Sequence, residues 1–130
     1  MIGKYFILLI LVATLFIKCT TDTYPQGKRL YTTYCANCHM EDGTGLGQLI
    51  PPLAKSDYLI SHRDNLACIV LNGLKGPIIV NGIKYDQVMP PAQYSAVQIN
   101  NIVNYIGTAW DNKMKPLALP DTEKVLADCQ

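Results

Sequence analysis

The stretch Tyr34–Gly45 reads YCANCHMEDGTG and concentrates three reactive side chains within five residues. Cys35 and Cys38 are separated by two residues, and His39 follows the second cysteine directly. Residues three positions apart lie on the same side of a helical turn, so both thiols can reach one bound group. The spacing predicts a compact site for a metal or a metal-containing cofactor.

Two common uses of a C-x-x-C pair fit the surrounding sequence poorly. A thioredoxin-like redox pair opens a helix beside a parallel sheet, whereas this pair closes a predicted helix and no β-α-β pattern is present. A structural zinc site needs four ligands, usually from a second cysteine pair or paired histidines. The chain offers only one further histidine, His62.

The full C-x-x-C-H pattern is the sequence sign of c-type haem attachment. A haem has two vinyl groups on neighbouring pyrroles, and each thiol can form a thioether with one of them. The residue after the second thiol then presents its imidazole to the iron from the same side. We therefore expect Cys35 and Cys38 to attach one haem c and His39 to ligate its iron.

Helices are predicted on both sides of the motif. One runs from Pro25 to the motif, with Thr23 and Gln26 as a capping box. Two short helices are expected at about 55–61 and 63–72. Loops connect these elements, because glycines and prolines interrupt the remaining pattern; the breakers are Gly43, Gly45, Gly47, Pro51, Pro52 and Gly73.

The second half of the chain predicts a hairpin and then the clearest helix. Asn81-Gly82 lies between β-branched runs, which favours a tight two-residue turn within about 77–86. Ser95 and Gln98 form a capping box for a helix that continues to Trp110. A last short helix is expected at 121–129. The apolar positions assigned to one buried stripe of the long helix are Val97, Ile99, Ile102, Val103, Ile106 and Trp110.

Taken together, these features resemble the class I cytochromes c of the small exported, monohaem type. The resemblance covers nearly all of residues 25–110. It rests on Gly27, Tyr31, CANCH, the following DGTG, the PPL of 51–53, Met89-Pro90, Tyr105 and Trp110.

The resemblance implies an all-α fold in which helices pack around one covalently attached haem, with the small hairpin as an addition. It implies that the first and last helices of the domain cross near Gly27. A backbone carbonyl in the Pro51–Pro52 stretch would accept a hydrogen bond from His39. Candidates to contact the haem propionates are Tyr85, Asn81 and Trp110. Residues 25–110 would form the cytochrome c domain, and residues 111–130 would form an extension packed on it.

Methionine is one of the axial ligands that proteins place opposite histidine, and it raises the reduction potential. Met40 is bonded to His39 and cannot reach the opposite face, and Met114 has charged neighbours. Met89 lies in a Pro-bounded loop before the long helix, so we expect it to be the sixth ligand. Two alternatives stay open: Met89 as an ordinary core residue, and His62 as the ligand.

The first residues predict export. Lys4 precedes an apolar run of thirteen residues, Tyr5–Ile17. That run is shorter than the ~20 residues of a membrane span and fits a signal peptide. Cys19 resembles the lipidated cysteine of bacterial lipoproteins, although Lys18 replaces the usual small residue before it. We expect a signal at 1–18, a tether at 19–24 and a periplasmic protein anchored to the membrane through lipidated Cys19. An uncleaved short anchor or a buried strand is the alternative.

Charge and the remaining cysteines add two expectations. Without residues 1–18 the chain has nine basic and ten acidic side chains and no basic stripe, so nucleic acid is not an expected partner. Cys68 and Cys129 would form a disulfide in an oxidising compartment. Alternatively, Cys68 is a small buried hydrophobe and Cys129 a free end.

The resemblance implies an electron carrier, not an enzyme. It would pass single electrons between periplasmic or membrane-bound redox proteins, such as an oxidase, a reductase or a dehydrogenase. A haem catalyst or gas sensor would need an open sixth position, against which Met89 argues. A third reading makes the haem a structural staple of a binding module.

Overall fold

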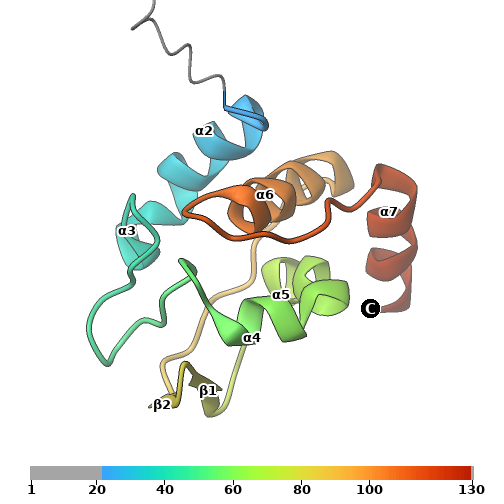
Figure 1. Ribbon diagram of the computed structural model, residues 1–130. Coiled ribbons are helices and arrows are strands. Elements are labelled where there is room, and N and C mark those ends of the chain that lie inside the picture. The colour runs from blue at the N-terminus through green and yellow to red at the C-terminus, as the bar shows by residue number, and fades with distance from the viewer. Residues whose placement is uncertain (1–21, 130) are drawn as a thin grey trace, which may run out of the picture.

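The structure, a computed structural model, describes residues 22–129; the predicted signal peptide and Cys19 lie outside the described residues. The described chain is mostly helical with one two-stranded hairpin (Figure 1), which confirms the predicted fold class. No helix among the described residues is long and apolar enough to cross a membrane. The elements are α2 (Pro25–Tyr34), α3 (Ala36–His39), α4 (Asp57–Ser61), the 3-10 helix η1 (Arg63–Asn65), α5 (Leu66–Asn72), β1 (Ile78–Val80), β2 (Ile83–Tyr85), α6 (Ala96–Thr108) and α7 (Leu119–Asp128).

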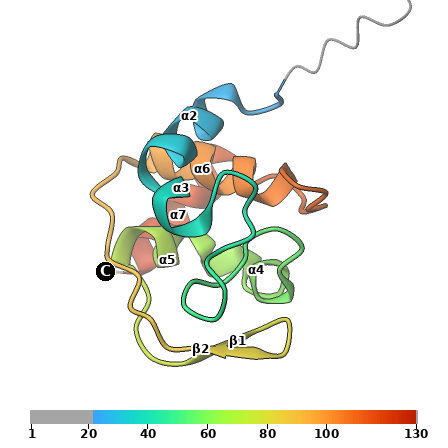
Figure 2. The ribbon, with the colours of Figure 1, turned by 90° about the vertical axis from the view of Figure 1, so that its left-hand side faces the viewer.

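Helices α2 and α6 cross each other and form one side of the core (Figures 1 and 2). Gly27 permits this crossing, because a β-carbon there would collide with the carbonyl oxygen of Asn101 and lie 2.7 Å from Cβ of Tyr105. Tyr31, one turn later, is 1% exposed. The predicted crossing near Gly27 is therefore present. The buried core comprises Tyr31, Leu59, Leu66, Ala67, Val70, Ile99, Ile102, Val103, Ile106 and Leu126.

The start of α6 follows its sequence signature, and the start of α2 does not. Both bonds of the Ser95–Gln98 capping box are present. Helix α2 instead has Tyr24 as its N-cap, without a side-chain bond, so the predicted Thr23 box is wrong. Pro25 thereby takes the first helical position, where its missing N–H costs nothing.

Five of the six positions assigned to the buried stripe lie at or beside the core. Helix α6 ends at Thr108, however, so the predicted continuation to Trp110 is wrong: Ala109 is extended and Trp110 has a φ of 52°. Val97 is 47% exposed, so its assignment to the stripe is wrong. The reason is periodicity. At 100° per residue, a position two residues before Ile99 faces almost the opposite side of the helix.

The hairpin has the predicted tight turn. Strands β1 and β2 are antiparallel with Val80 opposite Ile83, and Asn81 and Gly82 have φ values of 51° and 79°. The turn is attached to α4: the Asp57 carboxylate accepts a hydrogen bond from Asn81 N–H at 2.7 Å, and the Asn81 side chain accepts one from Asp57 N–H at 3.1 Å. The hairpin is therefore held beside α4.

The C-terminal segment packs back onto the helical core. Helix α7 lies against α5 and α6, and its Leu126 joins the core. The side chain of Asn104 in α6 holds the segment that connects α6 to α7 by bonding the backbone of Leu117. Asn104 Oδ1 accepts from Leu117 N–H at 2.8 Å, and Asn104 Nδ2 donates to Leu117 O at 2.9 Å. A disulfide joins Cys68 of α5 to Cys129 after α7, with the two Cα atoms 5.8 Å apart.

Candidate haem site

The C-x-x-C-H motif occupies a helical turn of its own. The sequence predicts one helix that delivers both cysteines, but α2 ends at Tyr34 and α3 begins after Cys35. The N–H groups of Cys38 and His39 both donate to the Cys35 carbonyl, at 3.1 and 2.9 Å. This turn stops at Met40, whose φ of 62° cannot continue a right-handed helix.

His39 is oriented by a backbone carbonyl. Its Nδ1 lies 3.1 Å from Pro51 O, which is the partner expected from the resemblance. Burial lowers the pKa of His39, and the bond to Pro51 opposes that shift only in part. The imidazole is thus neutral near pH 7. With Nδ1 donating to Pro51, the other ring nitrogen carries a lone pair that can bind a metal.

The loop between His39 and Pro51 is built around two glycines. Gly43 O accepts hydrogen bonds from Leu53 N–H and Ala54 N–H at 2.8 and 2.9 Å, and Gly45 N–H donates to His39 O at 3.0 Å. Gly45 has a φ of 72° and is so close to the 50–51 backbone that a β-carbon would lie 2.7 Å from the Pro51 carbonyl carbon. These contacts fold the chain back, so that Pro51 reaches the histidine.

A large apolar cavity lies beside the motif. Its walls enclose about 660 Å³ of space, part of it open to solvent. A second cavity of about 500 Å³ adjoins it, and His39, Pro51, Leu74, Ile78 and Met89 line both. Nearly all the walls are hydrophobic side chains, as a large apolar cofactor requires.

The two cysteines of the motif line different parts of this combined cavity. Cys35 is half-buried and lines the larger part, whereas Cys38 is exposed and lines the second part. Burial, and to a smaller extent the nearby Cys38, raise the pKa of the Cys35 thiol to about 11. Both are free thiols in the structure, available for covalent attachment.

Met89 is held at the cavity by a backbone bridge. Leu74 N–H donates to Met89 O at 3.0 Å, and Met89 N–H donates to Leu74 O at 2.9 Å. Sequence reasoning gave no sign of this bridge between positions fifteen apart.

The competing ligand candidates lie elsewhere. His62 stacks on Tyr58 with ring centroids 3.8 Å apart and lines neither part of the cavity. Met114 packs against Gly107, and Met40 is also absent from the lining. Among the described methionines and histidines, only His39 and Met89 line the cavity.

Of the three residues suggested for the propionates, only Tyr85 lines the cavity, and its hydroxyl donates to Gly47 O at 3.4 Å. Asn81 is bonded to Asp57, and Trp110 Nε1 donates to Glu41 O at 3.2 Å. Asn81 and Trp110 are therefore engaged away from the cavity.

The donor set fits haem c. Apolar walls suit the macrocycle, two free thiols on one turn suit thioether formation, and a carbonyl-oriented imidazole suits an iron ligand. Within residues 22–129, no cluster of three or more His, Cys, Asp or Glu side chains is arranged to hold a metal ion by itself.

Comparison with known proteins agrees with this fit. The profile of the cytochrome c family matches residues 25–110. Cytochrome c-552 of Thermus thermophilus is 34% identical over 112 residues, which cover 78% of this chain and 85% of that protein.

Larger proteins share the same segment. The cytochrome c subunit of the quinone alcohol dehydrogenase of Gluconacetobacter polyoxogenes is 30% identical over 101 residues, and that of Gluconobacter oxydans is 32% identical over 90. The match covers 67% and 66% of this chain, but only 19% and 18% of those subunits. The chain belongs to the cytochrome c family and is an electron-transfer protein with covalently attached haem c.

Proposed function

We propose that this protein is a monohaem c-type cytochrome with histidine–methionine ligation that carries single electrons between redox proteins. The observation that carries the proposal is the convergence of Cys35, Cys38, His39 and Met89 on one apolar cavity. Cys35 and Cys38 would hold the haem through thioethers, and His39 and Met89 would ligate its iron. When bound, the haem supplies a one-electron couple between ferrous and ferric iron.

The protein's own residues support that role in three ways. The Pro51 carbonyl orients the His39 ring and leaves its other nitrogen free, so that this nitrogen would ligate the iron of a bound haem. The bridge to Leu74 keeps Met89 at the cavity wall. The hydrophobic lining excludes water, which favours a stable ligand pair over an open coordination position.

Location and partners complete the proposal. Residues 1–18 would serve as an export signal and Cys19 as a lipidated anchor, followed by a tether at 19–24. The cytochrome domain of residues 25–110, with the extension of 111–130 packed on it, would then work in the periplasm at the membrane. The relatives that are subunits of a quinone alcohol dehydrogenase support a dehydrogenase as one partner. An oxidase or reductase would be the other.

Purification from a strain with haem-attachment machinery tests this function. The intact mass should correspond to one haem, loss of residues 1–18 and addition of lipid at Cys19. The ferric protein should show the charge-transfer band of a sulfur–iron bond, and Met89→Ala should remove it. Persistence of the band in that variant would exclude Met89 as the ligand.

Met114→Ala is the matched control, because Met114 is a described methionine that does not line the cavity. The control protein should keep the band. A colourless wild-type protein would refute the proposal as a whole.

A further inference from the structure

Residues 89–92, the segment that contains Met89, are attached to the end of α5. Every backbone N–H group of this segment takes part in the attachment. Pro90 and Pro91 have no N–H, so residues 89–92 offer only two. Met89 N–H donates to Leu74 O at 2.9 Å, and Ala92 N–H donates to Leu71 O at 3.1 Å. Met89 O accepts the N–H of Leu74 in return. No other part of the described chain provides a backbone bond to these donors.

Gly73 lies at the centre of this attachment. Its φ of 72° and ψ of −171° belong to a backbone region that is essentially reserved for glycine. A β-carbon at this position would collide with Met89 O and would lie 2.8 Å from both the Pro90 carbonyl carbon and Pro91 N. Any larger residue must therefore displace either the end of α5 or the segment that contains Met89.

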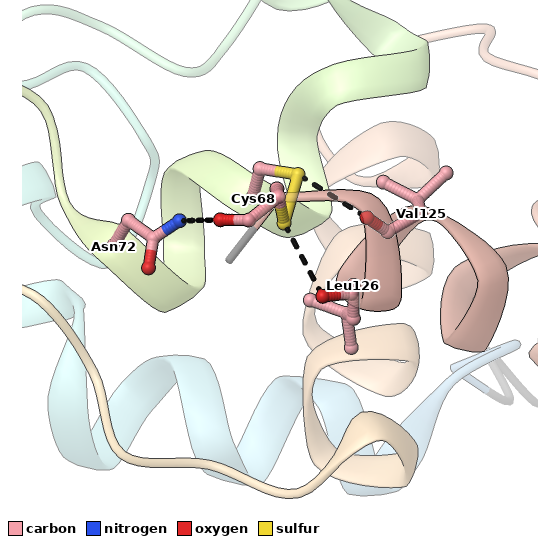
Figure 3. Close-up of a disulfide and its surroundings, with 5 residues drawn as sticks. Cys68, Asn72, Val125 and Leu126 are labelled. Atoms are coloured by element: carbon pink, nitrogen blue, oxygen red, sulfur yellow. Dashed lines mark hydrogen bonds between the residues drawn. A yellow bond between two sulfur atoms is a disulfide. The ribbon is translucent and has the colours of Figure 1, made fainter.

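The end of α5 is in turn attached to the C-terminus. Cys68 is bonded to Cys129, and one turn later Asn72 Nδ2 donates to Cys129 O at 2.8 Å. Figure 3 shows the disulfide of Cys68 and the hydrogen bond of Asn72, the two connections from α5 to the residue that follows α7. Asn72 directly precedes Gly73, so the last turn of α5 is held immediately before the bridge to Met89.

We propose that residues 71–74, called here the α5 end, position Met89 for iron ligation, with Gly73 as the positioning residue. The disulfide and Asn72 hold the α5 end in place. This inference rests on the proposed function, because it takes Met89 as the ligand. It assigns a role to a glycine and to a disulfide, neither of which touches the iron.

The positioning of Met89 can be measured by letting imidazole compete with Met89 for the ferric iron. Imidazole can bind the ferric iron only in molecules whose Met89 has dissociated from it. The apparent affinity for imidazole is therefore the intrinsic affinity multiplied by the fraction of such molecules. A weakened position of Met89 therefore appears as tighter imidazole binding. Once Met89 is replaced, nothing competes, and the geometry of the α5 end no longer matters to imidazole.

The experiment is a double-mutant cycle on the haem-loaded full chain, with Gly73→Ala, Met89→Ala and the double variant titrated with imidazole. Gly73→Ala should tighten imidazole binding by about tenfold, and this effect should vanish in the Met89→Ala background. Gly82→Ala is the control, because Gly82 also has a positive φ, of 79°, but a β-carbon there meets no atom within 4 Å. It should leave the affinity unchanged.

The outcomes separate the two proposals. If Met89→Ala fails to tighten imidazole binding, Met89 is not the ligand and the proposed function fails. If Met89→Ala tightens it but Gly73→Ala does not, or does so equally without Met89, the positioning role is overturned and the proposed ligand stands. An equal effect of Gly82→Ala also overturns it.

A second variant keeps the test decisive if Gly73→Ala does not accumulate with haem. Cys68→Ser combined with Cys129→Ser removes the disulfide at the far side of α5 and leaves the bridge to Met89 intact. We expect a smaller tightening of imidazole binding, again only when Met89 is present. An unchanged affinity in this variant would overturn the role assigned to the disulfide in holding the α5 end.

Discussion

Gly27 of α2 and Tyr105 of α6 are in direct contact, close enough that a β-carbon on the glycine would lie 2.7 Å from Cβ of the tyrosine. Around this contact, Tyr31 packs against Tyr105 and Trp110 with ring centroids 5.5 and 5.0 Å apart. The crossing thus holds the helix that leads into the haem-binding motif against α6, the longest helix among the described residues.

Gly27→Val should destabilise the protein strongly. The added side chain forces the helices apart, and overpacking of this kind costs roughly 1–3 kcal/mol or more. The measurement is guanidinium unfolding of the haem-loaded protein. Thr32→Val is the control, since Thr32 is exposed on the same helix. Similar midpoints for the two variants would contradict a tight crossing at Gly27.

Tyr31→Phe should reduce stability at neutral pH. The Tyr31 hydroxyl donates to Met40 O at 2.6 Å and links α2 to the residue after the proximal histidine. Loss of a buried hydrogen bond of this type costs about 1 kcal/mol. Urea unfolding of the two haem-loaded proteins at about pH 8 gives the difference in free energy of unfolding.

The free energies of unfolding of the wild-type protein and of Tyr31→Phe should approach each other at high pH. Burial raises the pKa of Tyr31 above its ordinary value of 10.0. The folded state therefore keeps a proton that the unfolded chain releases, and its stability falls as pH rises through about 10. Tyr31→Phe lacks this loss, so its disadvantage should shrink by about pH 11. Tyr94 and Tyr105 are present in both proteins and cancel; a constant gap would contradict the raised pKa.

Removal of the Cys68–Cys129 disulfide should lower the free energy of unfolding. The bridge spans a sequence separation of 61, for which the chain-entropy model gives roughly 4 kcal/mol. Denaturant unfolding of the double serine variant measures the loss. Cys68→Ser and Cys129→Ser alone serve as comparisons, because each also breaks the bridge and should cost a similar amount. A change within error would show that the bond adds no stability.

Electron transfer should depend weakly on salt. The second part of the cavity, where Cys38 is exposed, has no charged side chain in its lining. Leu46, Leu49 and Val88 are exposed large hydrophobics. Rates with one anionic and one cationic inorganic complex should each change by less than about tenfold between low and physiological ionic strength. A steep, opposite dependence for the two reagents would reveal a strong local field.

Local signals predicted local structure well. Ser95 and Gln98 define the start of α6, and Asn81-Gly82 forms the expected turn, because each depends only on residues within a few positions. The C-x-x-C-H motif also identified the cofactor, since covalent attachment needs that spacing. The Thr23 box failed because Pro25 is better accommodated one position earlier in the helix.

Contacts between distant segments could not be read in the same way. The bridge of Leu74 to Met89 uses backbone atoms, which leave no trace in side-chain patterns. For Cys68 and Cys129, the sequence favoured a disulfide but left two unpaired cysteines as the alternative. Their proximity depends on how α7 packs against α5, which only the folded chain determines.

The pairing of Asn104 with Leu117 has an evolutionary consequence. A single amide bonds both peptide groups of that residue, so these two hydrogen bonds do not depend on which side chain Leu117 bears. What this arrangement demands is a fixed count of residues between α6 and the anchored peptide. A one-residue insertion or deletion in the connecting segment should therefore put the wrong peptide opposite the amide, whereas a change of identity at an exposed position such as Lys113 should not.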